Sequence, residues 1–239
     1  MLLPDAGLAV AEKILSEALC IKPREISRFT TGYCHRVYYI NTKSDEYVLR
    51  LTNKENEKYW KGSVKWLPQL AELEIPVPKI LKYGYYEGVF YTLLSYLPAN
   101  DLGEVYHTLS DCQKRKIAKE LSAIQVKTAK LPASGFYGYP CSKGNFFATW
   151  MEYLSSLINR SFERITQNGI FKTNVCEEVR ALMYSLEEYF LQVSPTAFLD
   201  DISTKNVRIH EGKFAGIVDV DEICYGDRLL VVALTNMAL

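Results

Sequence analysis

The chain predicts a mixed α+β fold made of a β-rich first lobe, a short hinge and a mostly helical second lobe. Three observations lead to this prediction. Residues 26–96 contain several short β-rich runs, residues 97–101 have the composition of a linker, and residues 110–193 show helical spacing of apolar side chains. The predicted domains are therefore residues 1–96 and residues 97–239.

The first lobe is predicted to alternate helices and strands. Apolar side chains at helical spacing ahead of Pro23 predict an opening helix over residues 6–19. Two prolines keep residues 75–81 extended, because a proline disfavours the α region in the residue before it. The other predicted elements are strands over residues 26–40, 46–51, 82–86 and 89–96, a helix over residues 64–73, and a two-residue hairpin loop at Glu87-Gly88.

The second lobe is predicted to be helical first and to regain strands only near its end. Residues 131–145 are rich in glycine and proline and predict a loop. The predicted helices are residues 110–129, 146–167 and 175–193, and the predicted strands are residues 197–199, 207–210 and 214–220.

Composition excludes several classes of function. The 28 Lys and Arg residues balance the 28 Asp and Glu residues, and this zero net charge disfavours a nucleic-acid partner. The longest apolar run, residues 229–234, is too short to span a bilayer, so no membrane partner is expected. Six cysteines without CxxC spacing and no recognisable leader indicate reduced thiols and a cytoplasmic location.

The residues that indicate chemistry are Asp201, Asn206 and Asp219. Asp201 and Asn206 are five positions apart, and Asp219 ends the next apolar strand. This order matches the template for phosphoryl transfer, in which one Asp orients the attacking hydroxyl and an Asn and a second Asp hold metal. Mg²⁺ prefers such hard oxygen ligands. Turn-forming acids and an Asn that caps a hairpin are the alternative interpretation of the same residues.

At these residues the chain resembles the aminoglycoside-phosphotransferase-like family, distant relatives of the protein kinases. Residues 199–201 stand where the family has His-Gly-Asp, Asn206 follows at the family spacing, and residues 217–219 match its metal string. The resemblance implies a bilobal protein-kinase-like fold and a phosphotransferase that uses ATP or GTP with Mg²⁺. It implies that Asp201 is the catalytic residue and that Asn206 and Asp219 are the metal ligands.

The first lobe carries the weaker part of this resemblance. The strand over residues 47–51 looks like the one that carries the phosphate-contacting cation, which would be Arg50. Arg can replace Lys there because its guanidinium binds phosphate oxygens bidentately. The strand that ends in Ser95, Tyr96 and Leu97 looks like the hinge on which the nucleobase rests.

The chain departs from the family pattern at several positions. Leu199 replaces the usual His and Asp200 the usual Gly, so the support of the catalytic loop must differ. Ser63 stands where the main helix of the lobe normally offers a Glu, so Arg50 is expected to lack that ion pair or to obtain it from Glu55 or Glu57. The glycine-rich loop is reduced to residues 30–33.

Other residues are interpreted as structural or remain open. Asp221 and Glu222 are either ligands of a second metal or solvated acids, and His35, His107 and His210 are interpreted as surface or turn residues. The apolar segment 229–239 indicates either a longer natural chain or a face covered by a partner subunit, which would make the protein a homodimer.

The leading hypothesis is therefore a small-molecule O-kinase that phosphorylates a small hydroxylated substrate. A nucleotide-binding pseudokinase or regulatory module is the second hypothesis, motivated by Leu199 and Ser63. A two-metal hydrolase is the third. Members of the family phosphorylate aminoglycosides, macrolides, amino alcohols and sugars, and the sequence does not choose among these acceptors.

Overall fold

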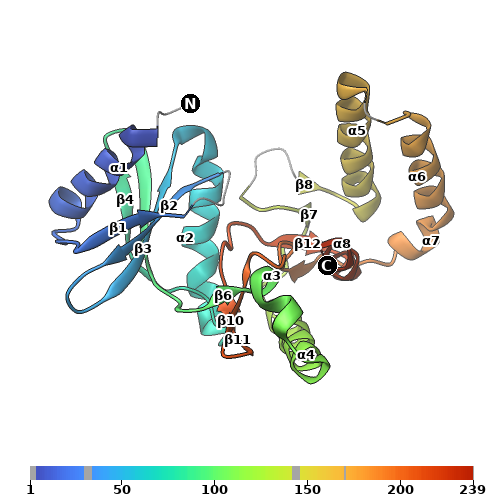
Figure 1. Ribbon diagram of the computed structural model, residues 1–239. Coiled ribbons are helices and arrows are strands. Elements are labelled where there is room, and N and C mark those ends of the chain that lie inside the picture. Colours follow the sequence, from blue (N-terminus) through green and yellow to red (C-terminus); the bar gives the residue numbers. More distant parts are fainter. Residues whose placement is uncertain (1–3, 30–33, 142–145, 170, 239) are drawn as a thin grey trace.

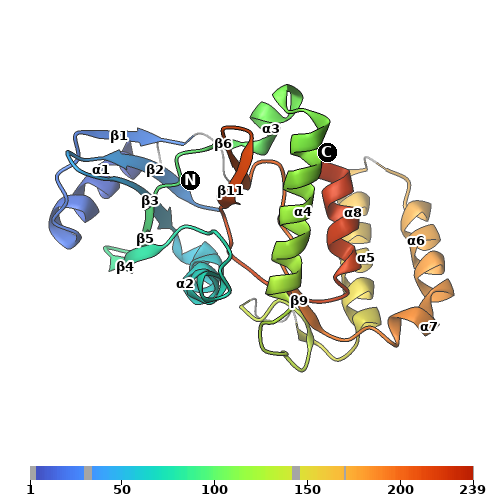
Figure 2. The same cartoon turned by 90° about the horizontal axis from the view of Figure 1, so that it is seen from below.

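The computed structural model describes residues 4–29, 34–141, 146–169 and 171–238. Its architecture is mixed α+β, as predicted (Figure 1). A sheet with helices α1 and α2 forms one part of the molecule, and helices α4 to α8 belong to the other part (Figures 1 and 2). The division into domains at residue 96 stays a prediction.

The largest sheet is antiparallel and has the strand order β1-β2-β3-β5-β4. The turn between β4 and β5 is the predicted two-residue loop, and both Glu87 and Gly88 have positive φ, as a type I′ turn requires. The strands are β1 (Glu25–Arg28), β2 (Arg36–Asn41), β3 (Glu46–Thr52), β4 (Ile80–Tyr86) and β5 (Val89–Ser95).

The two faces of this sheet have different neighbours. Helix α1 (Pro4–Lys13) and the π-helical turn Ile14–Ala18 pack on one face, where Leu49 and Leu51 of β3 join their apolar cluster. Side chains alternate along a strand, so Arg50 and Thr52 point to the opposite face. That face is the one toward helix α2 (Glu57–Glu72), whose buried Trp66 and Leu67 belong to a different cluster.

The remaining strands form two smaller sheets. β11, β10 and β6 form one sheet, and β8, β7, β12 and β9 form the other. Their bounds are β6 (Asn100–Asp101), β7 (Tyr137–Gly138), β8 (Phe146–Phe147), β9 (Thr196–Phe198), β10 (Val207–His210), β11 (Lys213–Ile217) and β12 (Cys224–Gly226).

Helices make up most of the second part, as the sequence predicts. Helix α4 begins with a capping box in which Ser110 and Gln113 satisfy each other's backbone N–H groups. The helices are α3 (Leu102–Val105), α4 (Asp111–Thr128), α5 (Trp150–Asn168), α6 (Asn174–Ser185), α7 (Glu187–Phe190) and α8 (Leu229–Ala238).

The largest hydrophobic cluster connects helix α2 to the later strands. Trp66, Leu67 and Leu70 of the helix share it with residues such as Val207 and Ile217. Burial of this apolar area stabilises the position of the helix beside the loop that follows β11. The cluster thus fixes the elements that surround the candidate site.

Local expectations were wrong in several places. Residues 146–147 form β8 although the predicted helix over residues 146–167 includes them, and the predicted helix over residues 175–193 is divided into α6 and α7. Two further differences show what decides the local structure. Residues 131–145 were predicted to be a loop, but Tyr137 and Gly138 form β7 because they pair with β12 and β8. Helix α2 begins at Glu57, well before the predicted residue 64, and a 3₁₀ turn capped by Asn53 precedes it. In both places tertiary contacts and capping decide the structure and apolar periodicity does not.

The carboxy-terminal segment forms helix α8. Val231 is buried in an apolar cluster, whereas Leu229 and Val232 are exposed. The homodimer through this segment stays a prediction. Among the helices of the described residues, none is both long and apolar enough to cross a membrane.

Candidate active site

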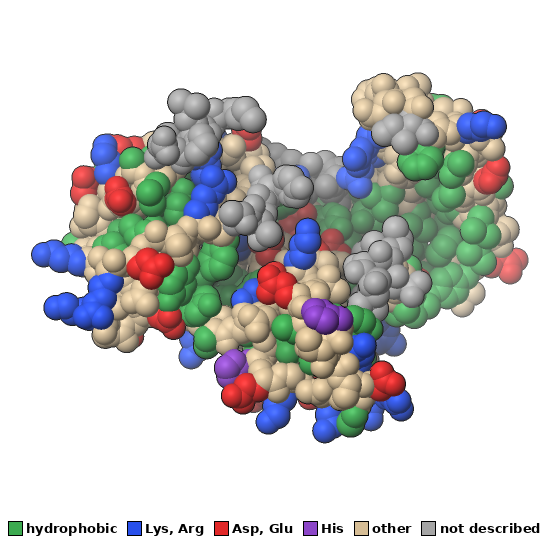
Figure 3. All heavy atoms as spheres, in the orientation of Figure 1, with side chains coloured by type: hydrophobic (Ala, Val, Ile, Leu, Met, Phe, Trp, Pro, Cys, Tyr) green, Lys and Arg blue, Asp and Glu red, His purple; other side chains and the backbone are tan. Residues whose placement is uncertain are grey.

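A cavity of about 530 Å³ is lined by residues from both parts of the molecule. The space-filling view shows acidic side chains inside the hollow between the two parts (Figure 3). The residues predicted from the sequence all line this cavity: Arg50, Ser95, Tyr96, Leu97, Asp201, Asn206 and Asp219. The structure therefore brings together groups that lie as much as 169 positions apart in the chain.

The loop after β9 presents one acid to the cavity. Asp201 is exposed, and its backbone carbonyl accepts a hydrogen bond of 3.2 Å from Nδ2 of Asn206. Because the amide nitrogen of the buried Asn206 is used in this way, its Oδ1 atom has no hydrogen-bond donor among the described residues. An amide oxygen in this position can serve as a metal ligand.

Gln125 of helix α4 supports the same loop in place of the usual histidine. Its Nε2 donates to the Leu199 carbonyl at 2.7 Å, and its Oε1 accepts from the Leu199 N–H at 3.1 Å. Both backbone groups of Leu199 are therefore fixed by one side chain. This support comes from a helix that no sequence motif connects to the site. That it differs from the support in other family members stays a prediction.

Asp200 also lines the cavity but is partly buried, whereas Asp201 is exposed. Asp200 accepts a hydrogen bond of 2.5 Å from the Tyr139 hydroxyl. Burial raises the pKa of Asp200 to about 6, although the hydrogen bond from Tyr139 acts in the opposite direction. The two adjacent acids therefore have different environments, as alternation along an extended segment requires.

Asp219 lies directly after β11 and beside Asn206. The Val218 N–H donates to the Asn206 carbonyl at 2.9 Å, which holds the two segments together. Asp219 has a φ of 61°, and its side chain is 47% exposed. A non-glycine residue in the left-handed region is strained and needs surrounding contacts to hold it.

Arg50 supplies one of those contacts. One of its terminal nitrogens donates to Asp219 Oδ1 at 2.9 Å and to Asp221 Oδ1 at 2.7 Å. The expectation that Glu55 or Glu57 holds Arg50 is wrong, because Glu57 pairs with Lys61 at 2.7 Å and Glu55 is exposed.

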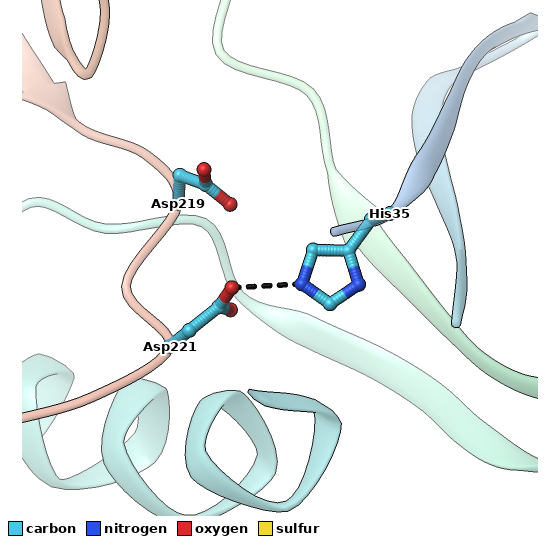
Figure 4. A group of neighbouring side chains, drawn as sticks. All are labelled: His35, Asp219 and Asp221. Carbon is cyan, nitrogen blue, oxygen red and sulfur yellow. Dashed lines mark hydrogen bonds and ion pairs between the residues drawn. The ribbon is translucent and has the colours of Figure 1, made fainter. Parts of the chain in front are cut away.

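His35 is buried, so its interpretation as a surface or turn residue is also wrong. Its Nε2 lies 2.7 Å from Asp221 Oδ2 (Figure 4). Its Nδ1 lies 2.8 Å from the Thr52 hydroxyl. A carboxylate that only accepts requires the proton on Nε2, so in the neutral ring Nδ1 accepts from Thr52.

Two carboxylates and an imidazole thus meet at one place. One donor atom from each of His35, Asp219 and Asp221 lies within 4.8 Å of the others, a spacing that could hold a metal ion. The Arg50 guanidinium already bonds to both carboxylates, however, so in this structure the cluster is an arginine site.

The two acids of this cluster have opposite pKa shifts. Burial alone would raise the pKa of Asp221, but Arg50 and His35 outweigh it and hold this pKa below its usual value. Burial raises the pKa of Asp219, and Asp221 adds to that effect while Arg50 opposes it. Asp221 is therefore the ionised, fully paired member, and Asp219 is the member that faces the cavity.

Helix α2 contacts this cluster through Gly62. A Cβ atom at Gly62 would lie 1.7 Å from the Asp221 carbonyl oxygen, so only glycine allows the helix this close to the backbone. Ser63 is buried beside it and donates to the Trp60 carbonyl at 3.0 Å.

The opposite end of the cavity is more apolar. Its wall includes Val48, Leu94 and Leu97. The Ser95 N–H donates to the Lys79 carbonyl at 2.9 Å, but the backbone groups of Tyr96 make no hydrogen bond with another described residue, and neither do those of Leu97. Open backbone groups beside apolar walls suit a flat heteroaromatic ring.

The comparison with protein-family models decides the assignment. The model of the phosphotransferase enzyme family matches residues 25–233, which is most of the chain. The chain belongs to the phosphotransferase enzyme family. It is a kinase-type phosphotransferase that acts on a hydroxyl group.

Solved structures with the same fold are aminoglycoside phosphotransferases and related kinases. A thermostable mutant of APH(4)-Ia, in a ternary complex with AMP-PNP and hygromycin B, superposes with a TM-score of 0.69 at 17% identity, covering 94% of this chain and 75% of that one. A fructosamine-3-kinase homologue from Haemophilus somnus gives 0.64 at 14% identity, covering 91% and 73%. APH(2")-IIa with streptomycin and ATP also gives 0.64 at 14% identity, covering 95% and 74%. No curated protein matches the chain.

Four residues of this phosphotransferase have contacts at the site that their sequence positions do not predict. Gln125 and His35 carry no motif, and only their buried polar contacts identify them. Gly62 interrupts a helical run, a position at which glycine is unfavourable without a packing reason. Asp221 was interpreted either as a ligand of a second metal or as a solvated acid. The glycine-rich loop predicted at residues 30–33 lies outside the described residues.

Proposed function

We propose that this phosphotransferase transfers the γ-phosphoryl group of ATP or GTP to a hydroxyl group of a small molecule, with Mg²⁺ as cofactor. The observation that supports the proposal most strongly is the meeting of Asp201, Asn206, Asp219 and Arg50 around one cavity. The AMP-PNP found in the APH(4)-Ia complex supports a nucleoside triphosphate as co-substrate.

The residues present fit a magnesium ion. The Asp219 carboxylate has one oxygen bonded to Arg50, and its Oδ2 atom has no partner among the described residues. The Asn206 amide oxygen is the second hard ligand, and backbone contacts hold the two residues side by side. When bound, Mg²⁺ neutralises developing charge on the phosphate oxygens during transfer.

Each protein group then has a defined task. Asp201 accepts the proton of the acceptor hydroxyl and orients its oxygen toward the phosphorus. Arg50 contacts the phosphates, and the backbone from Ser95 to Leu97 receives the base, with Tyr96 and Leu97 offering the open groups. Gln125 holds the loop that carries Asp201 in position through its two hydrogen bonds to the Leu199 backbone. Transfer of this kind depends on positioning and charge stabilisation more than on a strong base.

The six cysteines of the chain are all free thiols, which supports the proposed cytoplasmic location. The partners proposed here are a nucleotide and a small hydroxylated acceptor.

A thermal-shift screen followed by an acceptor panel tests the proposal. The protein is heated with ATP or GTP, with and without Mg²⁺, and a coupled assay then measures nucleoside diphosphate formed with amino alcohols, sugars, macrolides and aminoglycosides. We expect a Mg²⁺-dependent rise in melting temperature and diphosphate release that requires one acceptor class. Stabilisation without transfer to any acceptor would favour the pseudokinase hypothesis, and phosphate release from esters without nucleotide would favour the hydrolase.

A further inference from the structure

The structure provides an unusual anchor for the phosphate-contacting arginine. In place of an acid from helix α2, the residues that surround Arg50 are Asp219 and Asp221, which come from the segment after β11. Asp219 is already assigned to the metal in the proposed function. That assignment leaves Asp221 as the carboxylate that can stay with Arg50 throughout the reaction.

Asp221 is built for this role by burial and by its partners. Its side chain is 13% exposed, and that of Arg50 is 7% exposed. One carboxylate oxygen accepts from Arg50, and the other accepts from His35. A desolvated carboxylate needs this degree of pairing, because an unpaired buried charge is strongly unfavourable.

The chain of contacts continues beyond Asp221. His35 lies between Asp221 and the Thr52 hydroxyl, so the orientation of the ring is fixed from both sides. Thr52 is on β3, two positions after Arg50, and therefore points to the same face of the strand. Arg50 and the group that supports its anchor are thus held by one strand.

Helix α2 explains why the anchor comes from elsewhere. The backbone of Gly62 is so close to Asp221 that a methyl group would collide with the carbonyl oxygen. The hydroxyl of the adjacent Ser63 donates to the Trp60 carbonyl within the helix. Helix α2 therefore contacts the loop after β11 through its backbone at Gly62. The carboxylate that pairs with Arg50 comes from that loop, at Asp221.

We infer that Asp221, oriented by His35 and Thr52, is the positioning residue that holds Arg50 toward the nucleotide phosphates, in place of an acid on helix α2. The inference rests on the proposed function. It assigns Asp221 to the arginine and not to a second metal ion. The two roles make different predictions, because an arginine anchor acts only through Arg50, whereas a metal ligand acts only when metal is present.

A double-mutant cycle separates the two roles. Dissociation constants for ATP and GTP are measured by calorimetry in excess EDTA and again at saturating Mg²⁺, for the wild type, Asp221→Asn, Arg50→Met and the double variant. We expect Asp221→Asn to weaken nucleotide binding about tenfold in both conditions, since contacting charged residues couple by this order. In the Arg50→Met background the same substitution should have no further effect.

Milder variants keep the test informative if Asp221→Asn does not fold. Thr52→Val and His35→Gln should weaken binding in the same direction by smaller factors, and neither should add to the effect of Asp221→Asn. Glu57→Gln, which removes an acid from helix α2 that pairs with Lys61, is the matched control and should leave the affinity unchanged.

Several outcomes would overturn the inference. A loss of affinity that appears only with Mg²⁺ would make Asp221 a metal ligand. A loss in EDTA that persists in the Arg50→Met background would show that Asp221 does not act through Arg50. If Glu57→Gln weakened nucleotide binding as much as Asp221→Asn, the acid that positions Arg50 would lie on helix α2. If the wild-type protein binds neither nucleotide with Mg²⁺, the proposed function fails and the inference with it. Normal binding by the wild type with unchanged binding by Asp221→Asn would remove the inference alone.

Discussion

The site has two acidic segments, residues 200–201 after β9 and residues 219–221 after β11. Each contains one exposed and one partly buried acid, and the segments differ in the partner of the partly buried acid. In the first segment Asp201 is exposed to the cavity, and Asp200 is partly buried and bonded to Tyr139. In the second, Asp219 is half exposed, and Asp221 is partly buried and bonded to Arg50 and His35. Each segment therefore has one exposed acid and one acid whose carboxylate is hydrogen-bonded to neighbouring side chains.

The partner of the partly buried acid sets the direction in which its pKa shifts. Tyr139 is a neutral donor, so burial prevails and the pKa of Asp200 rises to about 6. Arg50 is a cation, so the pKa of Asp221 falls below its usual value. The difference teaches that one structural acid titrates close to neutral pH while the other stays ionised, although both lie beside the same cavity.

The largest effect is expected at the acid that faces the cavity in the second segment. Asp219→Asn removes the charged metal ligand and leaves Arg50 paired with Asp221. We expect nucleotide binding to lose its dependence on Mg²⁺, measured as equal dissociation constants with Mg²⁺ and with EDTA. Asp45→Asn, at an exposed hairpin acid far from the cavity, is the control. Retained Mg²⁺ dependence would show that Asp219 is not the metal ligand.

The next effect concerns the packing that holds the second segment. Gly62→Ala places a methyl group 1.7 Å from the Asp221 carbonyl, so helix α2 or the loop must move. We expect a loss of about 3 kcal/mol in the free energy of unfolding, measured by urea denaturation. Gly103→Ala is the matched control, because its methyl group would lie 3.2 Å from the Thr204 side chain and 3.9 Å from the Thr204 carbonyl oxygen, which is an ordinary contact. Equal stability of the two variants would contradict the close approach.

A smaller effect is expected from the support of the first segment. Gln125→Glu replaces the amide N–H₂ that donates to the Leu199 carbonyl with a second acceptor. The unsatisfied contact should cost about 1–3 kcal/mol of stability. Turnover should fall more than nucleotide affinity, because Asp201 shifts while the metal ligands stay in place. Gln192→Glu, at an exposed glutamine two residues after helix α7, is the control. An equal fall in turnover in both variants would exclude a role for Gln125 in holding the loop at Leu199.

The smallest effect sharpens the charge difference between the segments. A carboxyl whose pKa is raised on folding binds its proton more tightly in the folded state, so its contribution to stability decreases as pH rises from about 4 to about 6. Asp200→Asn removes this pH dependence. Relative to the wild type, the free energy of unfolding of the variant should therefore rise by up to about 3 kcal/mol between pH 4 and pH 7, and no further above pH 7. Denaturant titrations at successive pH values measure the difference.

Tyr139→Phe extends that prediction. Without the hydroxyl that donates to the carboxylate, the pKa of Asp200 should rise further, so the decrease in stability should extend to higher pH. A difference between Asp200→Asn and wild type that does not vary with pH would contradict the raised pKa.

The sequence predicts the site better than it predicts what holds the site. Asp201, Asn206 and Asp219 have a local spacing that the chemistry of phosphoryl transfer requires, and strands of apolar residues fix their order. The strands β3, β5 and β10 follow from short runs rich in apolar, aromatic and β-branched residues between turn residues, and the β4–β5 hairpin follows from Glu87-Gly88.

The supporting residues could not be found in this way because their partners are distant in the chain. Gln125 meets Leu199 across 74 positions, and His35 meets Asp221 across 186. A glutamine on an amphipathic helix and a single histidine after a turn have no local pattern that separates them from surface residues. Their roles depend on tertiary packing, which side-chain periodicity does not encode.

The most direct test of the account compares phosphoryl transfer and nucleotide binding in Asp201→Asn. With the acceptor found in the panel, the wild type should form nucleoside diphosphate, and the variant should do so slower by a factor of about a hundred or more, since it lacks the proton acceptor. Its dissociation constant for Mg²⁺-nucleotide should equal that of the wild type. Unchanged transfer by Asp201→Asn would contradict the account, because the acid that the first segment offers to the cavity would then have no part in the reaction.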